Sequence, residues 1–395
     1  MIFQALDNKI DCVGVYGDGK IHKDPDLKLL KLESTWDATP NLIIRDATYA
    51  KLLCEKDNID DACPEHLKEK WQEVCKKLKV FLRCLNVAQI NLNENCFFDL
   101  VPDSFLMNFY ETKNKITQHV LENYQRPPNY EFMKEVNFLL HEINSRPLNL
   151  DLHNASRKLK TKVDVSQFNK IKNASNKVSY NMYAARTGRM ATKYNSFPIL
   201  NFNKKFRSVL RPKNDWLLEL DFNANELRVL LALAGKPQPK EDIHAWNAKN
   251  VFRGLVSRDK AKERIFAWLY NSESKDYLAN RAYDRFTIKE KYWDGKIVTT
   301  PFDRKIEADD FHALNYLIQS TASDLLLKQA IKINKLLKGR ESFITAVIHD
   351  SILIDYKEHD RDILKKLVET FQKTDLGLFG ANISVGKNFG AMKKL

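Results

Sequence analysis

The sequence predicts an α+β fold with two or more subdomains, and three observations support this. The chain has 395 residues, of which 44% are hydrophobic, so it can bury more than one core. Apolar runs at Phe343–Ile348 and Ile352–Tyr356 flank the polar His349-Asp350-Ser351, which predicts a hairpin of two strands. The periodic stretch from Gln319 to Lys338 is followed by Gly339, which predicts a long helix that ends there.

Residues 1–104 are predicted to form a small α+β segment. Residues 2–6 and 11–17 have the pattern of two short strands, and a Lys-rich amphipathic helix is expected from about Pro64 to Leu85. Six cysteines lie in this segment: Cys12, Cys54, Cys63, Cys75, Cys84 and Cys96. None has the short C-x₂₋₄-C spacing of zinc sites, so we expect reduced, partly buried thiols.

The pattern becomes helical from Leu106 to Asn144, with an interruption at Arg126-Pro127-Pro128. From about Tyr180 onward strands and helices alternate. Leu217–Asp221 has the pattern of a strand, and the following Glu226–Ala234 has that of a helix closed by Gly235.

The charge of the chain favours a polyanionic partner. Lys and Arg number 64 against 51 Asp and Glu, a formal net charge of +13. Nucleic acid is favoured over a membrane, although a solvated basic surface is the alternative interpretation. The N-terminus lacks a signal-peptide pattern and no apolar run is long enough to span a bilayer, so we expect a soluble, cytoplasmic protein.

Two aspartates are candidates for a metal site. Asp221 ends an apolar strand, and Asp350 lies in the tight connection of the hairpin 129 residues later. Each alone could be an ordinary turn former. If the strand ends are adjacent in one sheet, the two carboxylates could hold a pair of Mg²⁺ ions for in-line phosphoryl transfer.

Four residues recur at every fourth position in a predicted helix: Arg258, Lys262, Phe266 and Tyr270. Such residues form a slowly drifting stripe along one face. Two cations followed by two aromatic rings could bind the triphosphate, sugar and base of a nucleotide from end to end. The alternative is an amphipathic helix whose two rings lie in the core.

Five segments, in this order, resemble motifs of the family A DNA polymerases, the bacterial DNA polymerase I and T7-type group. Asp221 to Leu230 is similar to motif A, Arg258 to Tyr270 to motif B, and Val347 to Ser351 to motif C. Two further segments also match: Thr187-Gly188-Arg189 and Asn315 to Asp324. The resemblance is to a compact, phage-like member.

The resemblance implies a right-hand polymerase fold, with an antiparallel-sheet palm and helical fingers and thumb. The expected divisions are a reduced or vestigial exonuclease-like region at 1–104, the thumb at 105–180, the palm at 181–235 and 311–395, and the fingers at 236–310.

The resemblance also assigns roles to individual residues. Asp221 and Asp350 would hold two Mg²⁺ ions, for which Mn²⁺ can substitute, with the backbone carbonyl of Phe222 as a further ligand. Lys262 would protonate the pyrophosphate leaving group. Residues expected to bind the dNTP are Arg258, Lys262, Phe266, Tyr270, Glu226 and His244. Residues expected to contact primer and template are Arg189, Asn315, Gln319 and His349.

The implied function is template-directed, primer-dependent DNA synthesis from dNTPs, by a protein that acts as a monomer and whose processivity or replisome partners are unknown. Phe266 predicts discrimination against dideoxynucleotides, and Glu226 resembles the steric gate that excludes ribonucleotides. The first strand lacks the D-x-E of proofreading domains, so no 3′–5′ exonuclease is expected.

Four positions depart from the family pattern. Ser351 stands where many relatives carry Glu, Asn225 replaces an apolar residue, and Ala267 and Asn271 replace glycines. Two other functions remain open: a single-subunit RNA polymerase, against which Glu226 argues, and a non-catalytic DNA-binding relative.

Overall fold

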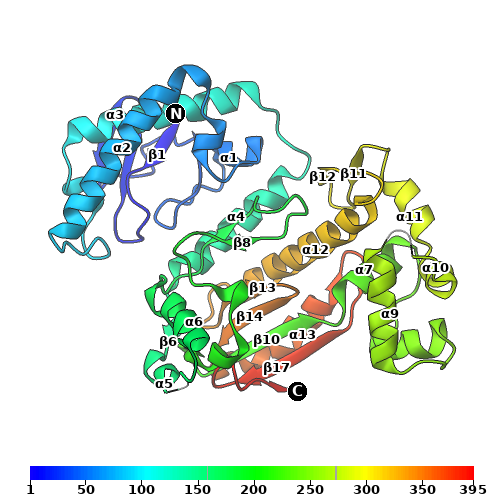
Figure 1. Ribbon diagram of the computed structural model, residues 1–395. Coiled ribbons are helices and arrows are strands. Elements are labelled where there is room, and N and C mark those ends of the chain that lie inside the picture. The colour runs from blue at the N-terminus through cyan, green and yellow to red at the C-terminus, as the bar shows by residue number, and fades with distance from the viewer. Residues whose placement is uncertain (158, 272–273) are drawn as a thin grey trace. The chain divides into compact units, whose positions relative to one another are not determined.

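The computed structural model describes residues 1–157, 159–271 and 274–395 (Figure 1). Two compact units divide the chain, Met1–Ser145 and Arg146–Leu395. This boundary falls within the expected helical segment 105–180, so its residues belong to two different units. Within the described ranges, no helix is both long and apolar enough to span a membrane.

The first unit combines a small sheet with long helices. Strands β1, β2 and β3 form an antiparallel sheet in that order. The first two lie within the predicted strands 2–6 and 11–17, and β3 adds a strand that was not predicted. Aromatic contacts join α2 to α3, with the rings of Trp71 and Phe109 5.3 Å apart. The elements are β1 Phe3–Ala5, β2 Gly14–Gly17, β3 Lys20–Lys23, β4 Ser34–Thr35, β5 Thr48–Tyr49, α1 Ala50–Cys54, α2 Glu65–Val87, α3 Asp103–Asn123 and α4 Tyr130–Ser145, with 3₁₀ turns at Ile59–Ala62 and Phe97–Asp99.

The prediction of six reduced cysteines is wrong for two of them. Cys12 and Cys96 form a disulfide across 84 residues. The backbone N–H of Phe97 donates to the Asp7 carboxylate at 2.9 Å, which brings the segment before Phe97 against the turn after β1. Spacing along the sequence could not reveal this pairing, because a fold contact places the two cysteines together. Cys54 and Cys63 are free and buried, and burial raises the pKa of both thiols.

A partly buried lysine in α3 predicts a pH-dependent stability. Burial lowers the pKa of Lys113 from 10.5 to about 8, against the opposing influence of Asp37 and Cys75. The charged form is therefore disfavoured in the folded state. The charged lysine therefore destabilises the folded protein. This destabilisation is fully present below about pH 8 and decreases as the pH rises toward 10.5, the pKa of lysine in the unfolded chain.

Lys113→Met is expected to stabilise the protein at pH 7 by about 1 to 2 kcal/mol, a value reduced for the partial exposure of the side chain. The gain should shrink by pH 10, as measured by urea unfolding at both pH values. Lys115→Met, an exposed position in the same helix, is the matched control. A gain that is the same at both pH values would contradict the electrostatic explanation.

The second unit is built on a five-stranded antiparallel sheet with the order β13-β14-β10-β17-β18. Its strands are β6 Asn149–Leu150, β7 Tyr180–Asn181, β8 Ala191–Thr192, β9 Leu210–Arg211, β10 Trp216–Phe222, β11 Ile297–Thr299, β12 Lys305–Glu307, β13 Phe343–Ile348, β14 Ser351–Tyr356, β15 Lys373–Thr374, β16 Gly377–Leu378, β17 Ala381–Gly386 and β18 Lys393–Lys394. Its helices are α5 Leu152–Ser156, α6 Lys162–Asn173, α7 Asn225–Leu233, α8 Ile243–Trp246, α9 Arg258–Tyr270, α10 Tyr277–Tyr283, α11 Arg285–Tyr292, α12 Ala313–Leu337 and α13 Leu364–Gln372.

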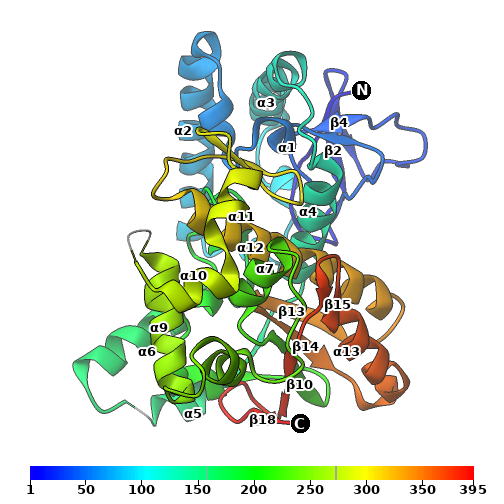
Figure 2. The same ribbon diagram turned by 90° about the vertical axis from the view of Figure 1, so that its right-hand side faces the viewer.

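Helices α12 and α13 cover one face of this sheet (Figure 2). Alternation along β10 places Leu218, Leu220 and Phe222 on the covered face, where the Phe222 ring stacks on Phe371 of α13 at 4.2 Å. Glu219 and Asp221 therefore lie on the opposite face. The fold thus separates an apolar packing face from a polar face of the same strand.

The strands and helices of this unit largely follow the sequence pattern. The hairpin β13–β14 and the helix α9 have the predicted bounds, apart from the inclusion of Ser351 in β14. The helix α12 begins at Ala313, six residues before the predicted start at Gln319. The cause is a loop contact: Asp309 accepts the backbone N–H of His312 at 2.8 Å, which fixes the turn that leads into the helix.

Candidate active site

Asp221 and Asp350 are brought together by strand register. Asp221 pairs with Ser351 across β10 and β14, and Asp350 immediately precedes Ser351 in the turn. The backbone N–H of Phe222 donates to the carbonyl of Asp350 at 3.1 Å, which ties that turn to the end of β10. The two aspartates predicted from separate motifs are therefore neighbours where β10 ends and β14 begins.

The environment of Asp221 disfavours its charge in the absence of a cation. Burial is the main cause that raises the pKa of Asp221 to about 6. The carboxylates of Glu219 and Asp350 contribute to this rise, and a hydrogen bond from Asn382 Nδ2 at 3.2 Å opposes it. A desolvated carboxylate with two other carboxylates near it forms a site suited to a hard cation such as Mg²⁺. The residues present therefore fit a divalent metal.

Asn225 fixes the orientation of Asp350. Its buried Nδ2 group donates to Asp350 Oδ1 at 3.3 Å and to the carbonyl of Ala322 in α12 at 3.2 Å. An apolar side chain at position 225 could make neither bond. The departure at this position thus adds a contact between α7, the hairpin turn and α12.

The hairpin turn itself has a left-handed residue. His349 has φ +50°, and its Nε2 atom lies 2.9 Å from the carbonyl oxygen of Leu200. His349 is exposed, so its ring is not part of the core.

Glu226 receives two charge-assisted contacts. It lies in the first turn of α7 and is buried, with Arg189 donating to Oε1 and the Tyr270 hydroxyl donating to Oε2. Burial and the Glu226 carboxylate raise the pKa of Tyr270. The glutamate therefore links the C-terminal end of α9 to the segment that follows Asp221.

The stripe on α9 faces outward, contrary to the core alternative. The buried residues of this helix are Ala261, Ile265, Trp268 and Leu269. The Phe266 and Tyr270 rings stack with centroids 5.9 Å apart, and Tyr270 is 46% exposed. Lys262 is exposed on the same stripe. An exposed aromatic and basic stripe is available to a ligand.

Arg258 and His244 are positioned through Asp242. Arg258 donates to both Asp242 oxygens, at 3.1 and 3.0 Å, and Asp242 also caps α8. His244 is 5% exposed, its ring lies 5.8 Å from that of Phe266, and burial lowers its pKa. The sequence pattern gave no role to Asp242, although an Asp two residues before His244 is a typical helix cap.

Arg228 is a structural residue that the sequence reasoning missed. It is fully buried, and it donates to the carbonyls of Asn223, Pro239 and Glu241. These contacts hold the loop that leads to Asp242. The sequence did contain one indication of this role: Arg228 lies two residues after Glu226 on a helix that has a buried face.

The segment Thr187-Gly188-Arg189 packs against a buried ion pair. Arg304 forms two bonds to Asp324 of α12, at 2.9 and 2.7 Å, with both side chains buried. A Cβ atom on Gly188, which has φ +73°, would lie 2.6 Å from the Arg304 guanidinium carbon. Ser323 donates to the Gly188 carbonyl at 3.1 Å. Glycine is required here for close approach, and the turn positions Arg189.

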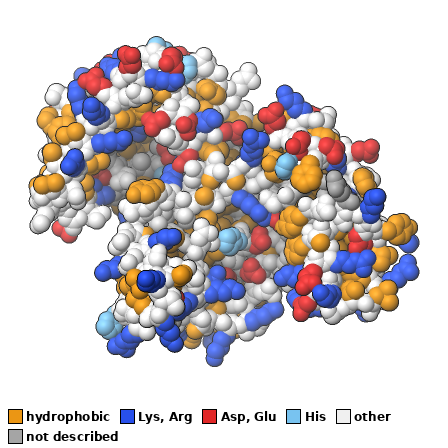
Figure 3. Space-filling view, in the orientation of Figure 1, with side chains coloured by type: hydrophobic (Ala, Val, Ile, Leu, Met, Phe, Trp, Pro, Cys, Tyr) orange, Lys and Arg blue, Asp and Glu red, His pale blue; other side chains and the backbone are white. Residues whose placement is uncertain are grey.

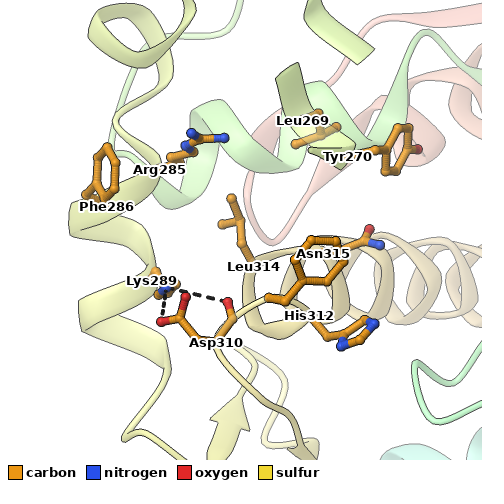
Figure 4. Close-up of a pocket in the computed structure, with 10 residues that line it drawn as sticks. Leu269, Tyr270, Arg285, Phe286, Lys289, Asp310, His312, Leu314 and Asn315 are labelled. Carbon is orange, nitrogen blue, oxygen red and sulfur yellow. Dashed lines mark hydrogen bonds and ion pairs between the residues drawn. The ribbon is translucent and has the colours of Figure 1, made fainter. Parts of the chain in front are cut away.

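Asn315 and Gln319 lie one turn apart on α12, with Gln319 Nε2 donating to Asn315 Oδ1 at 2.8 Å. Asn315 also lines a pocket of about 120 Å³ between the end of α9, α11 and the start of α12 (Figure 4). Tyr270 and Phe286 line it as well, and Lys289 pairs with Asp310 at its edge. Rings and cations at the end of the α9 stripe suit a stacked base and a phosphate.

In the space-filling view, acidic side chains gather near the ends of β13 and β14, and Lys and Arg side chains surround them (Figure 3). This arrangement suits a polyanion that approaches a cation site, because the surrounding charges attract what the carboxylates alone would repel.

No family model matches the sequence. The chain is 24% identical over 248 residues to a DNA polymerase of Mycobacterium phage D29, an alignment that covers 52% of this chain and 40% of the relative. It is also 24% identical over 237 residues to DNA polymerase I of Caldicellulosiruptor bescii, covering 46% of this chain and 28% of the relative. The matched regions thus span less than half of either relative.

A solved structure shares the fold. The POL domain of Pol1 from M. smegmatis, in complex with DNA primer-template and dNTP, matches with a TM-score of 0.56 and 14% identity, covering 72% of this chain and 76% of that one. The chain therefore has a polymerase fold. The chain is thus similar in sequence to two DNA polymerases and in fold to a polymerase domain.

Proposed function

We propose that this protein carries out template-directed, primer-dependent DNA synthesis from dNTPs. The observation that carries the proposal is the register of β10 and β14, which brings Asp221 and Asp350 together where β10 ends and β14 begins. The outward-facing stripe of α9 reaches the same region through the contact between Tyr270 and Glu226. The similarity to DNA polymerases supports this assignment.

Asp221 and Asp350 would hold two Mg²⁺ ions, with the Phe222 carbonyl as a further ligand; Mn²⁺ would substitute. When bound, the ions supply positive charge to the attacking and leaving oxygens of an in-line displacement. Asn382 and Asn225 orient the two carboxylates through the hydrogen bonds described above. The protein thus supplies a pre-arranged site rather than one assembled by the ligand.

The α9 stripe would bind the incoming nucleotide. Arg258 and Lys262 would neutralise the triphosphate, and Lys262 would donate a proton to the leaving pyrophosphate. Phe266 would pack on the deoxyribose, and Tyr270 would lie at the template-base position. His244, which is buried beside Phe266, would support this end of the site.

Glu226 would exclude ribonucleotides. Both of its oxygens are already bonded and the side chain is buried, so it cannot move aside easily for a ribose 2′-hydroxyl. A fixed carboxylate beside the sugar favours DNA synthesis over RNA synthesis. Primer and template would contact Arg189, Asn315, Gln319 and His349, where minor-groove acceptors are common to all base pairs.

The domain assignment follows from these roles. The five-stranded sheet supports a palm at 181–235 and 311–395, and the α9 region supports fingers at 236–310, with a thumb at 105–180. We further propose that the protein acts as a monomer without 3′–5′ proofreading. The Asp7 carboxylate of the first unit accepts from Asn8, Lys9 and Phe97, so it is engaged in holding its own turn.

A primer-extension assay tests the function. Purified protein is expected to extend a DNA primer with dNTPs and Mg²⁺, to stop in EDTA, and to incorporate rNTPs far more slowly. Glu226→Ala is expected to raise rNTP incorporation by at least about tenfold, because a 2′-hydroxyl no longer meets a fixed side chain.

A primer with a 3′ mismatch is included to test for nuclease shortening. Equal use of rNTPs and dNTPs by the unmodified protein would favour an RNA polymerase. Absence of Mg²⁺-dependent extension on every template, with DNA binding retained, would favour a non-catalytic relative. Shortening of the mismatched primer would contradict the proposed lack of proofreading.

A further inference from the structure

A third carboxylate lies on the polar face of β10. Glu219 precedes Asp221 by two residues, so the side chains of both project from the same face of the strand. Glu219 is half-buried, and Ser351 Oγ donates to its Oε1 at 3.1 Å. Ser351 directly follows Asp350. Glu219 is thus connected to both predicted metal-binding carboxylates, to one by the strand and to the other by the turn.

We propose that Glu219 is a positioning residue for the metal site, whose negative charge helps to hold the divalent cation between Asp221 and Asp350. This inference rests on the proposed function and extends it to a residue outside the five motifs. It also gives Ser351 a purpose, because a serine hydroxyl can fix Glu219 from the neighbouring strand, whereas an acidic side chain at position 351 would repel it.

In this proposal Glu219 is not a direct ligand of the metal ion. In the described parts of the chain, no three His, Cys, Asp or Glu side chains are placed to share one ion. Its influence would therefore be electrostatic, directly or across a water, and a full charge at this range changes cation affinity substantially in a partly buried site.

A purely structural role for Glu219 is the rival explanation. Ser351 Oγ lies within reach of both Glu219 and the carbonyl of Ile348, at 3.1 Å each, so the contact could simply close the hairpin turn. The two explanations require different properties of Glu219. The structural role needs the hydrogen bond, and the electrostatic role needs the charge.

Two substitutions separate bond from charge. Glu219→Gln retains an oxygen that can accept from Ser351 and removes the charge, whereas Ser351→Ala removes the donor and keeps the charge. Mn²⁺ titration of the protein alone, followed by the electron paramagnetic resonance of free Mn²⁺, measures cation affinity without any reaction. Glu219→Gln is expected to weaken Mn²⁺ binding about tenfold, and Ser351→Ala by less than about threefold.

The Mg²⁺ concentration for half-maximal primer extension should rise about tenfold in Glu219→Gln as well. Glu219→Asp, which keeps the charge, should recover most of the Mn²⁺ affinity. Glu369→Gln, an exposed glutamate of α13, is the matched control and should behave as the unmodified protein. Urea unfolding of each variant shows that the comparison is between folded proteins.

Three results would overturn the inference: unchanged Mn²⁺ affinity in Glu219→Gln, equal losses in Glu219→Gln and Ser351→Ala, or no recovery in a folded Glu219→Asp. Failure of the proposed function would differ from failure of the Glu219 role. If the unmodified protein does not extend a primer, the proposed function fails, but Mn²⁺ binding that depends on Glu219 would still support its role in the metal site. If extension is normal and Mn²⁺ binding does not depend on Glu219, only the Glu219 role fails.

Discussion

Asp221→Asn is expected to slow primer extension on the order of a hundredfold to a thousandfold, the effect of removing one group that stabilises developing charge. Primer-template binding should persist, because cationic side chains elsewhere supply most of the affinity for a polyanion. The measurement is single-turnover extension at saturating DNA, together with DNA binding by fluorescence anisotropy.

Loss of the fold is not an adequate explanation for this expected result. The pKa of Asp221 is raised to about 6, so its ionised form is disfavoured in the folded protein without metal, and stability falls as the pH rises from about 4 to 6. A neutral asparagine removes that penalty and should not destabilise the protein at pH 7. Asp375→Asn, which affects only surface pairs with Lys328 and Lys332, is the matched control. Extension at the normal rate by Asp221→Asn would contradict the site assignment.

Asp324→Asn is expected to lower the free energy of unfolding by about 3 to 5 kcal/mol, because it removes the carboxylate charge that pairs with the buried Arg304 guanidinium. The loss should be visible in urea unfolding at pH 7. It should also weaken extension, since Arg304 packs directly on the Gly188 turn that carries Arg189.

The chain offers a matched pair for comparison. Arg340 and Asp362 make a similar two-pronged contact at 2.7 and 2.8 Å, but Asp362 is 64% exposed. Asp362→Asn should therefore change stability by less than about 1 kcal/mol. Equal effects of the two substitutions would show that burial does not govern the cost. Partial recovery of stability by Arg304→Met in the Asp324→Asn background would show that the loss comes from the buried Arg304 charge once the Asp324 charge is removed.

Local patterns in the sequence predicted local structure well. The α9 helix and the β13–β14 hairpin follow from periodicity and turn residues, and the pairing of Asp221 with the Asp350 turn follows from two strands of one sheet. The helix face that carries Phe266 could not be decided between surface and core from its spacing alone. Burial of Trp268 and its neighbours on the other face decides it.

Contacts between distant residues could not be predicted from the sequence. Three contacts join residues by tertiary packing: the disulfide of Cys12 and Cys96, the ion pair of Arg258 with Asp242, and the hydrogen bond from Ser351 to Glu219. No periodicity encodes such partners. Asn225 is a further example. The sequence shows only that a polar residue replaces an apolar one, and its role depends on two acceptors that the fold brings to it.

Asp221, Glu226 and Arg228 stand on one uninterrupted piece of backbone, where the end of β10 turns into the first turns of α7. The first would face the reacting atoms, the second would meet the sugar, and the third grips the loop that carries Asp242 and through it Arg258. The spacing among these three residues is therefore set by the geometry of one short stretch of backbone. A single residue inserted between Glu226 and Arg228, inside α7, would rotate Arg228 by about 100° around the helix relative to Glu226.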